Sequence, residues 1–191
     1  ANAYQINGIP TWLLSGEMHY FKMPRNDWRR RLVQLKCAGF NAVSVYMPWN
    51  YHELSEGVWN FSDDRDIEHF LALAAELGLY VIARPGPYIC NEWHAGGLPA
   101  WLSAKPGMRL RTKDPQFLAY VDKWWGQIVP IIRRYELGRD GTVILVQVEN
   151  EYGHFGEGQE PAYIYHLRDG LRKYGVTVPI INCDSFINFS R

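Results

Sequence analysis

Short, continuously apolar runs alternate with longer helical patterns along the chain, and this alternation constrains the fold more than any other feature. Strands with apolar residues at successive positions are buried on both faces, which is typical of a parallel sheet covered by helices. The repeated strand–helix unit therefore predicts either a doubly wound sheet or a (β/α)8 barrel. The expected strands are residues 11–16, 41–49, 79–87, 142–150 and 178–185, and the expected helices are residues 26–39, 66–78, 114–135 and 160–175.

Local signals mark the ends of the expected helices. In the second helix, apolar residues recur on one face from Phe70 to Leu77, and Gly78 is a C-terminal stop. In the third helix, Pro115 lies near the start, where proline is tolerated, and Pro130 predicts a kink. These signals support helices rather than further strands between the apolar runs.

The residues that follow the expected strands favour the barrel. No GxGxxG or GxxxxGK[ST] motif follows the first strand, so a nucleotide-binding doubly wound sheet has no support. Polar and aromatic residues instead recur after strand ends, in "GEMHY", "YMPWNYHE", "RPGPYICNEW", "ENEYG" and "CDS". Barrel active sites are built at this one face. We expect residues 1–191 to form the N-terminal part of one α/β domain, a (β/α)8 TIM barrel, supplying about the first five strands and four helices.

Charge and composition argue against several kinds of partner. The chain has 20 basic and 20 acidic residues without a basic stripe, so we expect neither nucleic acid nor an anionic membrane as a partner. No apolar run approaches the roughly 18 residues of a membrane span. The chain starts at Ala1, so a signal peptide could have been removed. The cysteines Cys37, Cys90 and Cys183 form no CxxC, and we expect each to be a small buried hydrophobe.

The fourth apolar run stops at three polar residues, Glu149, Asn150 and Glu151. A carboxylate at the mouth of a buried strand is partly desolvated, which raises its pKa and can keep it protonated near neutrality. Such an acid can donate a proton to a leaving oxygen, and the Asn150 amide can bond a hydroxyl. Glu151 is therefore a candidate glycosidase acid/base, with a solvated loop acid as the alternative. Glu149 is more typical of a structural residue.

A second candidate group follows the second and third expected strands. Glu92 lies beside Trp93 in a loop made irregular by Gly-Gly-Leu-Pro, and Tyr46 places a phenol near a strand exit. A carboxylate that accepts hydrogen bonds from hydroxyls, next to a ring that packs on a C–H face, is the usual makeup of a sugar site. Trp49 and Trp101 lie in similar loop-like stretches and suit the same cleft. The alternative is a loop acid beside a packing tryptophan.

Other catalytic chemistries find little support. Histidines occur near strand ends, but there is no HExxH and no tight His/Cys pair, which argues against a metal centre. A cysteine nucleophile would need a local base that the sequence does not identify. No GxSxG elbow is present, which argues against a serine hydrolase.

With these residues assembled, the chain resembles the family 35 glycoside hydrolases, the β-galactosidases. The resemblance spans nearly the whole chain, from "SGEMHYFKMPRNDW" through "YMPWNYHE" and "RPGPYICNEWHAGGLPAWL" to "VQVENEYG". It implies a (β/α)8 catalytic barrel followed by β-rich domains. It also implies retaining hydrolysis of terminal β-linked galactose without a cofactor, and a secreted, periplasmic or lysosomal location, with a cytoplasmic one still open.

The resemblance also assigns roles to individual residues. The second glutamate of "ENEYG", Glu151, is the implied acid/base, and Asn150 before it is expected to bond the 2-hydroxyl of the sugar. Glu92 and Tyr46 fall on positions that bind galactose hydroxyls. Many family members have alanine where this chain has Asn91; that contact is implied to be through the backbone, so Asn91 remains a candidate substrate contact.

The resemblance leaves one catalytic group unassigned. The family nucleophile is a glutamate after the seventh barrel strand, and only five strands are recognisable here. Retaining hydrolysis needs two carboxylates about 5–5.5 Å apart, and Glu92 is assigned to sugar binding. We therefore expect these 191 residues alone to be inactive and to need the remainder of the barrel in cis or in trans. The alternatives are a partial barrel that binds galactose without hydrolysing it, a purely structural one, or a family member that acts on another β-linked sugar.

Overall fold

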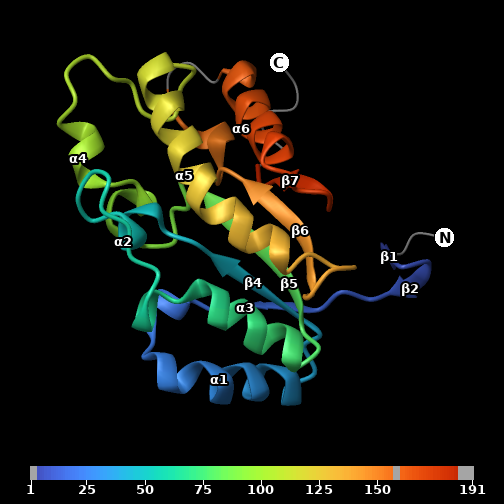
Figure 1. Ribbon diagram of the computed structural model, residues 1–191. Helices are drawn as coiled ribbons and strands as arrows, with labels where there is room; N and C mark the ends of the chain where they lie inside the picture. The colour runs from blue at the N-terminus through green and yellow to red at the C-terminus, as the bar shows by residue number, and fades with distance from the viewer. Residues whose placement is uncertain (1–3, 157–159, 185–191) are drawn as a thin grey trace.

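A computed structural model describes residues 4–156 and 160–184 of the chain. Its main feature is a five-stranded sheet in which every neighbouring pair is parallel and the strands follow their sequence order, β3-β4-β5-β6-β7 (Figure 1). A separate antiparallel hairpin, β1 (Tyr4–Ile6) and β2 (Ile9–Thr11), precedes it. The sheet strands are β3 (Ser15–Glu17), β4 (Ala42–Tyr46), β5 (Tyr80–Gly86), β6 (Val143–Val148) and β7 (Ile180–Asn182).

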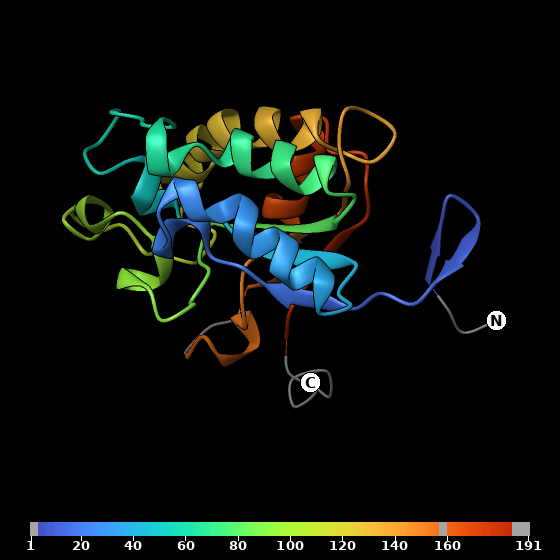
Figure 2. The same cartoon turned by 90° about the horizontal axis from the view of Figure 1, so that it is seen from below.

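The long helices follow one another around the outside of this sheet (Figures 1 and 2). They are α1 (Arg25–Cys37), α3 (Ile67–Glu76), α5 (Pro115–Arg134) and α6 (Pro161–Lys173). Each contacts the next in this order. A doubly wound sheet would reverse its strand order and carry helices on both faces, so the sequential order identifies part of a (β/α)8 barrel. The expected fold class, with five strands and four long helices, is confirmed.

Short helical turns occupy the loops between these elements. They are α2 (Trp49–His52), α4 (Ala100–Ser103) and the 3-10 turns η1 (Tyr20–Lys22), η2 (Asp63–Arg65), η3 (His94–Gly97) and η4 (Tyr152–His154). The sequence patterns did not predict them. Within residues 4–156 and 160–184, no helix is both long and apolar enough to cross a membrane.

The N-terminal segment differs from the expected single strand over residues 11–16. That stretch is divided between β2 and β3, and Trp12 in the connection is 80% exposed. The hairpin turns at Asn7 and Gly8, which have φ values of 52° and 77°. Asn-Gly is the preferred dipeptide of a two-residue hairpin turn because both central residues need positive φ. Asn7-Gly8 is therefore the sequence signal for this hairpin.

The cysteines and the last strand also differ from the sequence-based expectations. Cys37 and Cys183 are exposed and Cys90 is half-buried, so the expected burial of the cysteines was wrong. The expected fifth strand ran to residue 185, which lies outside the described residues; β7 itself is shorter.

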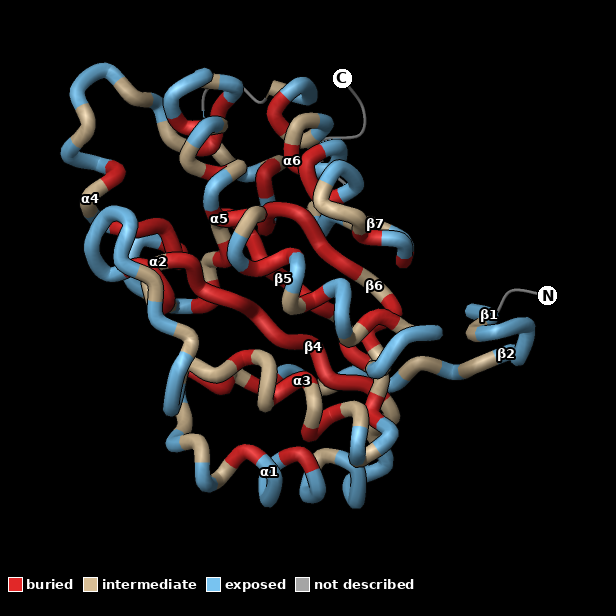
Figure 3. The backbone as a smooth tube through the Cα atoms, in the orientation of Figure 1, coloured by how far each residue is buried: buried red, intermediate tan, exposed pale blue. Residues whose placement is uncertain are grey.

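Many of the aromatic residues belong to the buried hydrophobic core or pack against it. The central strands β4, β5 and β6 are buried over most of their length (Figure 3). Trp49, expected at a cleft, is fully buried and stacks on Trp124 with ring centroids 6.1 Å apart. Its indole nitrogen donates to Glu53 at 2.6 Å. Trp59, Trp93 and Trp101 are half-buried and pack against this core.

The buried ring of His52 should make the free energy of unfolding depend on pH. The ring is fully buried; Nδ1 donates to the Asn60 carbonyl at 2.9 Å, so neutral Nε2 accepts from the Tyr20 hydroxyl at 2.5 Å. Burial lowers the pKa of His52 from 6.5 to about 4. Between pH 6.5 and 4, the unfolded chain therefore binds a proton at His52 while the folded chain does not. The contribution of His52 to the free energy of unfolding is complete above about pH 6.5 and is lost as the pH falls toward 4. We expect a loss on the order of 3 kcal/mol.

The measurement is urea unfolding between pH 7.5 and 4.5 in a polypeptide that carries these residues and the remaining barrel strands (the complete barrel). His52→Gln should reduce the pH slope, whereas His94→Gln, at an exposed ring, should keep it. Equal slopes in His52→Gln and the wild type would show that His52 does not control it.

Candidate active site

The candidate residues come from the carboxyl ends of neighbouring parallel strands, which meet at one edge of the sheet. Tyr46 is the last residue of β4, and Glu149, Asn150 and Glu151 directly follow β6. The loop that carries Glu92 follows β5. In a barrel this edge is where catalytic side chains gather.

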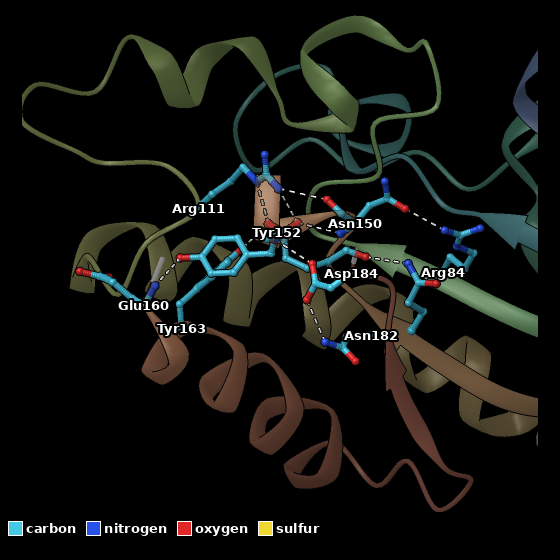
Figure 4. Close-up of polar contacts among 11 residues, drawn as sticks. Arg84, Arg111, Asn150, Tyr152, Glu160, Tyr163, Asn182 and Asp184 are labelled. Carbon is cyan, nitrogen blue, oxygen red and sulfur yellow. Dashed lines mark hydrogen bonds and ion pairs between the residues drawn. The ribbon is translucent and has the colours of Figure 1, made fainter. Parts of the chain in front are cut away.

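Arg84 on β5 connects two of the candidate residues. One guanidinium nitrogen donates to Oδ1 of Asn150 at 2.7 Å (Figure 4). Another donates to Oε1 of Glu17 at 2.7 Å. The guanidinium carbon also lies 3.8 Å from the centroid of the Tyr46 ring, a cation–π contact. Arg84 therefore links the end of β4 to the polar segment after β6.

Tyr46 is held as a protonated phenol. Burial raises its pKa well above 10, and the positive charge of Arg84 opposes that shift only in part. The residue is 7% exposed and lies at the carboxyl end of β4. A phenol that stays protonated can donate to a sugar hydroxyl or accept from one.

His19, which follows β3, connects Tyr46 to the loop after β5. Its ring centroid is 5.8 Å from that of Tyr46, and its Nδ1 is 3.3 Å from Nδ2 of Asn91. Burial lowers the pKa of His19, the Lys22 charge lowers it further, and acidic neighbours that include Glu92 oppose the shift. A neutral ring can accept the hydrogen bond of the Asn91 amide.

The loop after β5 has an unusual backbone. Cys90, Asn91 and Glu92 have φ values of 56°, 54° and 44°, in the left-handed region that costs about 1–3 kcal/mol for each non-glycine residue. The Lys22 ammonium holds the loop by donating to the Asn91 carbonyl at 2.9 Å and to its Oδ1 at 3.0 Å. Asn91 is buried, whereas Glu92 is exposed and able to meet a ligand. Backbone strain of this kind clusters at ligand sites.

Glu151 lies at the β6 exit in a left-handed conformation, with φ 50° and ψ 41°. Its N–H donates to the Cys183 carbonyl at 2.8 Å, which joins the β6 exit to the residue after β7. The expected partial burial of Glu151 was wrong for this chain, because the residue is exposed. The reason is that the described residues supply only one arc of the barrel wall, so part of the strand-end face stays open to solvent.

Glu149 is a buried structural carboxylate that fixes this exit. Arg111 donates to both of its oxygens, at 2.9 and 2.8 Å, and also to the Asn150 carbonyl at 3.1 Å (Figure 4). The Tyr163 hydroxyl donates to Oε1 of Glu149 at 3.0 Å, and the Asn150 N–H donates to Oε2 at 2.7 Å. Each carboxylate oxygen therefore accepts from two donors. Burial raises the pKa of Glu149 and the Arg111 charge opposes this. Since all four partners donate, the carboxylate is ionised. The structural interpretation of Glu149 agrees with these contacts.

Sequence reasoning missed the two arginines that organise the site. Arg84 lies 66 residues from Asn150, and Arg111 lies 38 residues from Glu149. Neither belongs to a local motif with a chemical meaning of its own. The only available signal for Arg84 was a charged residue inside an apolar strand, because such a charge is buried only when it is paired. Within residues 4–156 and 160–184, no group of three His, Cys, Asp or Glu side chains is placed to hold a metal.

Solved structures of glycosidases share the barrel fold of this chain. A solved structure of an exo-beta-1,4-mannosidase from Opitutaceae bacterium strain TAV5 is similar, with a TM-score of 0.74 over 92% of this chain and 32% of that one. The identity is only 14%, so this likeness shows the fold alone.

The sequence determines the family. The profile of Glycosyl hydrolases family 35 matches residues 3–188, so the chain belongs to that family. The beta-galactosidase of Bos taurus is 53% identical over 154 residues, which cover 81% of this chain and 24% of that protein. The human beta-galactosidase-1-like protein 2 is 42% identical over 182 residues, or 95% of this chain and 28% of that protein. The chain thus spans about a quarter of the length of these relatives.

Proposed function

We propose that this chain is part of a retaining exo-glycosidase that removes terminal non-reducing β-D-galactose from β-galactosides. Two findings support β-galactosides as the substrate class. The chain belongs to glycosyl hydrolases family 35, and relatives that are about 50% identical to it are named beta-galactosidases. The observation that carries the site is the Arg84 bridge, which joins Asn150, next to Glu151, to Tyr46.

In this proposal Glu151 is the acid/base. It protonates the glycosidic oxygen as the bond to the anomeric carbon breaks, while a glutamate elsewhere in the complete barrel attacks that carbon. The ionised Glu151 then takes a proton from the water that hydrolyses the glycosyl-enzyme. No cofactor is required by this chemistry.

The remaining candidate residues bind the terminal sugar. Asn150 contacts the 2-hydroxyl, and Tyr46, Asn91 and Glu92 contact other hydroxyls of galactose. The network through His19 and Arg84 supports this assignment because it joins Asn91, Tyr46 and Asn150 through direct contacts. Contacts of this kind hold binding residues in fixed positions.

The function is tested with the complete barrel on aryl glycosides. We expect hydrolysis of the β-galactoside, no hydrolysis of the α-galactoside, and at least about tenfold lower kcat/KM for the β-glucoside, since one misplaced hydroxyl costs about a hydrogen bond. Proton NMR of the first-formed sugar should show the β anomer. Release of α-galactose would contradict the retaining mechanism.

Two additions to this panel, an aryl β-glucosaminide and calorimetry with galactose, separate the alternatives. Preference for the β-glucosaminide would indicate a family member that acts on another sugar. Galactose binding by calorimetry without turnover of any substrate would indicate a binding protein, and neither binding nor turnover would indicate a structural barrel.

A further inference from the structure

We propose that Arg84 is a positioning residue that orients the Asn150 amide, so that its Nδ2 donates a hydrogen bond to the 2-hydroxyl of the sugar. The inference rests on the proposed function and adds to it the direction of this hydrogen bond and the residue that sets it. In Figure 4 the guanidinium of Arg84 faces the amide of Asn150.

The chemistry of the pair fixes which amide atom faces Arg84. A guanidinium has only donors, so the atom 2.7 Å from its nitrogen must be the amide oxygen of Asn150. The oxygen and nitrogen of an asparagine amide are ordinarily hard to distinguish, but this partner leaves no choice. Nδ2 with its two hydrogens therefore lies on the side of the amide away from this bond.

Asn150 is held at its backbone as well as its side chain. Its N–H donates to Glu149 at 2.7 Å, and its carbonyl accepts from Arg111 at 3.1 Å. The residue is 5% exposed. Within residues 4–156 and 160–184, Nδ2 makes no hydrogen bond. A fixed amide whose donor group has no protein partner is suited to meet a ligand acceptor.

Arg84 is itself held rigidly. It is 9% exposed, donates to Glu17 at 2.7 Å, and lies against the Tyr46 ring at 3.8 Å. Glu17 has a side chain that is 48% exposed, so it tolerates the loss of its partner without leaving a buried charge. Replacing Arg84 by methionine therefore releases the Asn150 amide while retaining most of the apolar packing of the side chain.

This arrangement predicts dependence on an acceptor at carbon 2. Hydrogen bonds to the 2-hydroxyl strengthen in the transition state of glycoside hydrolysis. If Arg84 acts mainly through Asn150, its loss should matter far more for substrates that carry the 2-hydroxyl than for substrates that lack it. A residue with a general structural role would instead affect all substrates equally.

The experiment compares kcat/KM of the complete barrel for an aryl β-galactoside and its 2-deoxy analogue. The proteins are the wild type, Arg84→Met, Asn150→Ala and the double variant. We expect Arg84→Met to lose on the order of 30-fold on the 2-hydroxy substrate and less than about threefold on the 2-deoxy one. The double variant should be no slower than Asn150→Ala. Arg29→Met is the matched control, because Arg29 makes a bidentate surface pair with Glu76 at 2.7 and 2.6 Å, and it should change neither value.

A second variant guards against misfolding. Arg84→Lys retains one donor and should recover most of the preference for the 2-hydroxy substrate, and the melting temperature of each variant confirms folding. Equal losses on both substrates, or losses that multiply in the double variant, would overturn the role of Arg84 and leave the proposed function intact. A wild type that hydrolyses neither galactoside would overturn the proposed function, and this inference with it.

Discussion

Glu151→Gln in the complete barrel is expected to lower kcat/KM for a β-galactoside with a poor leaving group by about 10³-fold, the usual contribution of a general acid. The amide keeps the shape of the side chain and removes its proton. A dinitrophenyl β-galactoside, whose leaving group needs no protonation, should retain most of its first-step rate. Steady-state assays with a series of aryl galactosides measure this difference. The kcat/KM of Glu151→Gln should fall more steeply with increasing pKa of the leaving group than the kcat/KM of the wild type.

The control for this substitution is Glu68→Gln on α3. Glu68 pairs with Arg134 on the outer helix layer, so its loss should leave turnover within about twofold of the wild type. If Glu151→Gln hydrolysed the poor substrate within a few fold of the wild-type rate, Glu151 would not be the proton donor.

Arg111→Met is expected to destabilise the complete barrel by about 3–5 kcal/mol, because it leaves the buried carboxylate of Glu149 without its counter-charge. Glu149 is 2% exposed and Arg111 is 8% exposed, so water cannot replace the lost partner. The guanidinium also lies 3.6 Å from the centroid of the Tyr88 ring, and methionine keeps much of that packing. Urea denaturation at pH 7 measures the loss.

A double variant separates the charge from the packing. Adding Glu149→Gln to Arg111→Met removes the unpaired charge and should recover at least about 2 kcal/mol of the loss. Arg29→Met, at the exposed pair with Glu76, should cost less than about 1 kcal/mol. Additive losses in the double variant would mean that the two residues do not act as a pair.

The elements that sequence reasoning predicted well are those with a strong local period. Residues 66–78 and 114–135 were expected to be helical, and α3 and α5 lie within those ranges. Asp66 and Asp114 cap these helices by accepting from backbone N–H groups. Such signals depend on residues within a few positions of one another, so they can be recognised without the fold.

The site was only partly predictable, because its organising contacts are long-range. Glu149 was interpreted as structural, and its four donors agree with that role. The roles proposed for Glu151, Asn150 and Glu92 remain predictions. Trp49 was assigned to the cleft because it lies in a loop-like stretch, but its ring packs in the core. Local sequence does not distinguish an aromatic ring that lines a cleft from one buried behind it.

Azide rescue of Glu151→Ala tests the central claim most directly. Azide is a nucleophile that needs no deprotonation, so it does not require Glu151 as a base. In Glu151→Ala it can occupy the space of the lost side chain and attack the glycosyl-enzyme from the face that water normally uses. With a dinitrophenyl β-galactoside and azide, the complete barrel carrying Glu151→Ala should recover turnover and release β-galactosyl azide, identified by NMR. No recovery, or formation of α-galactosyl azide, would contradict the assignment of Glu151 as the acid/base.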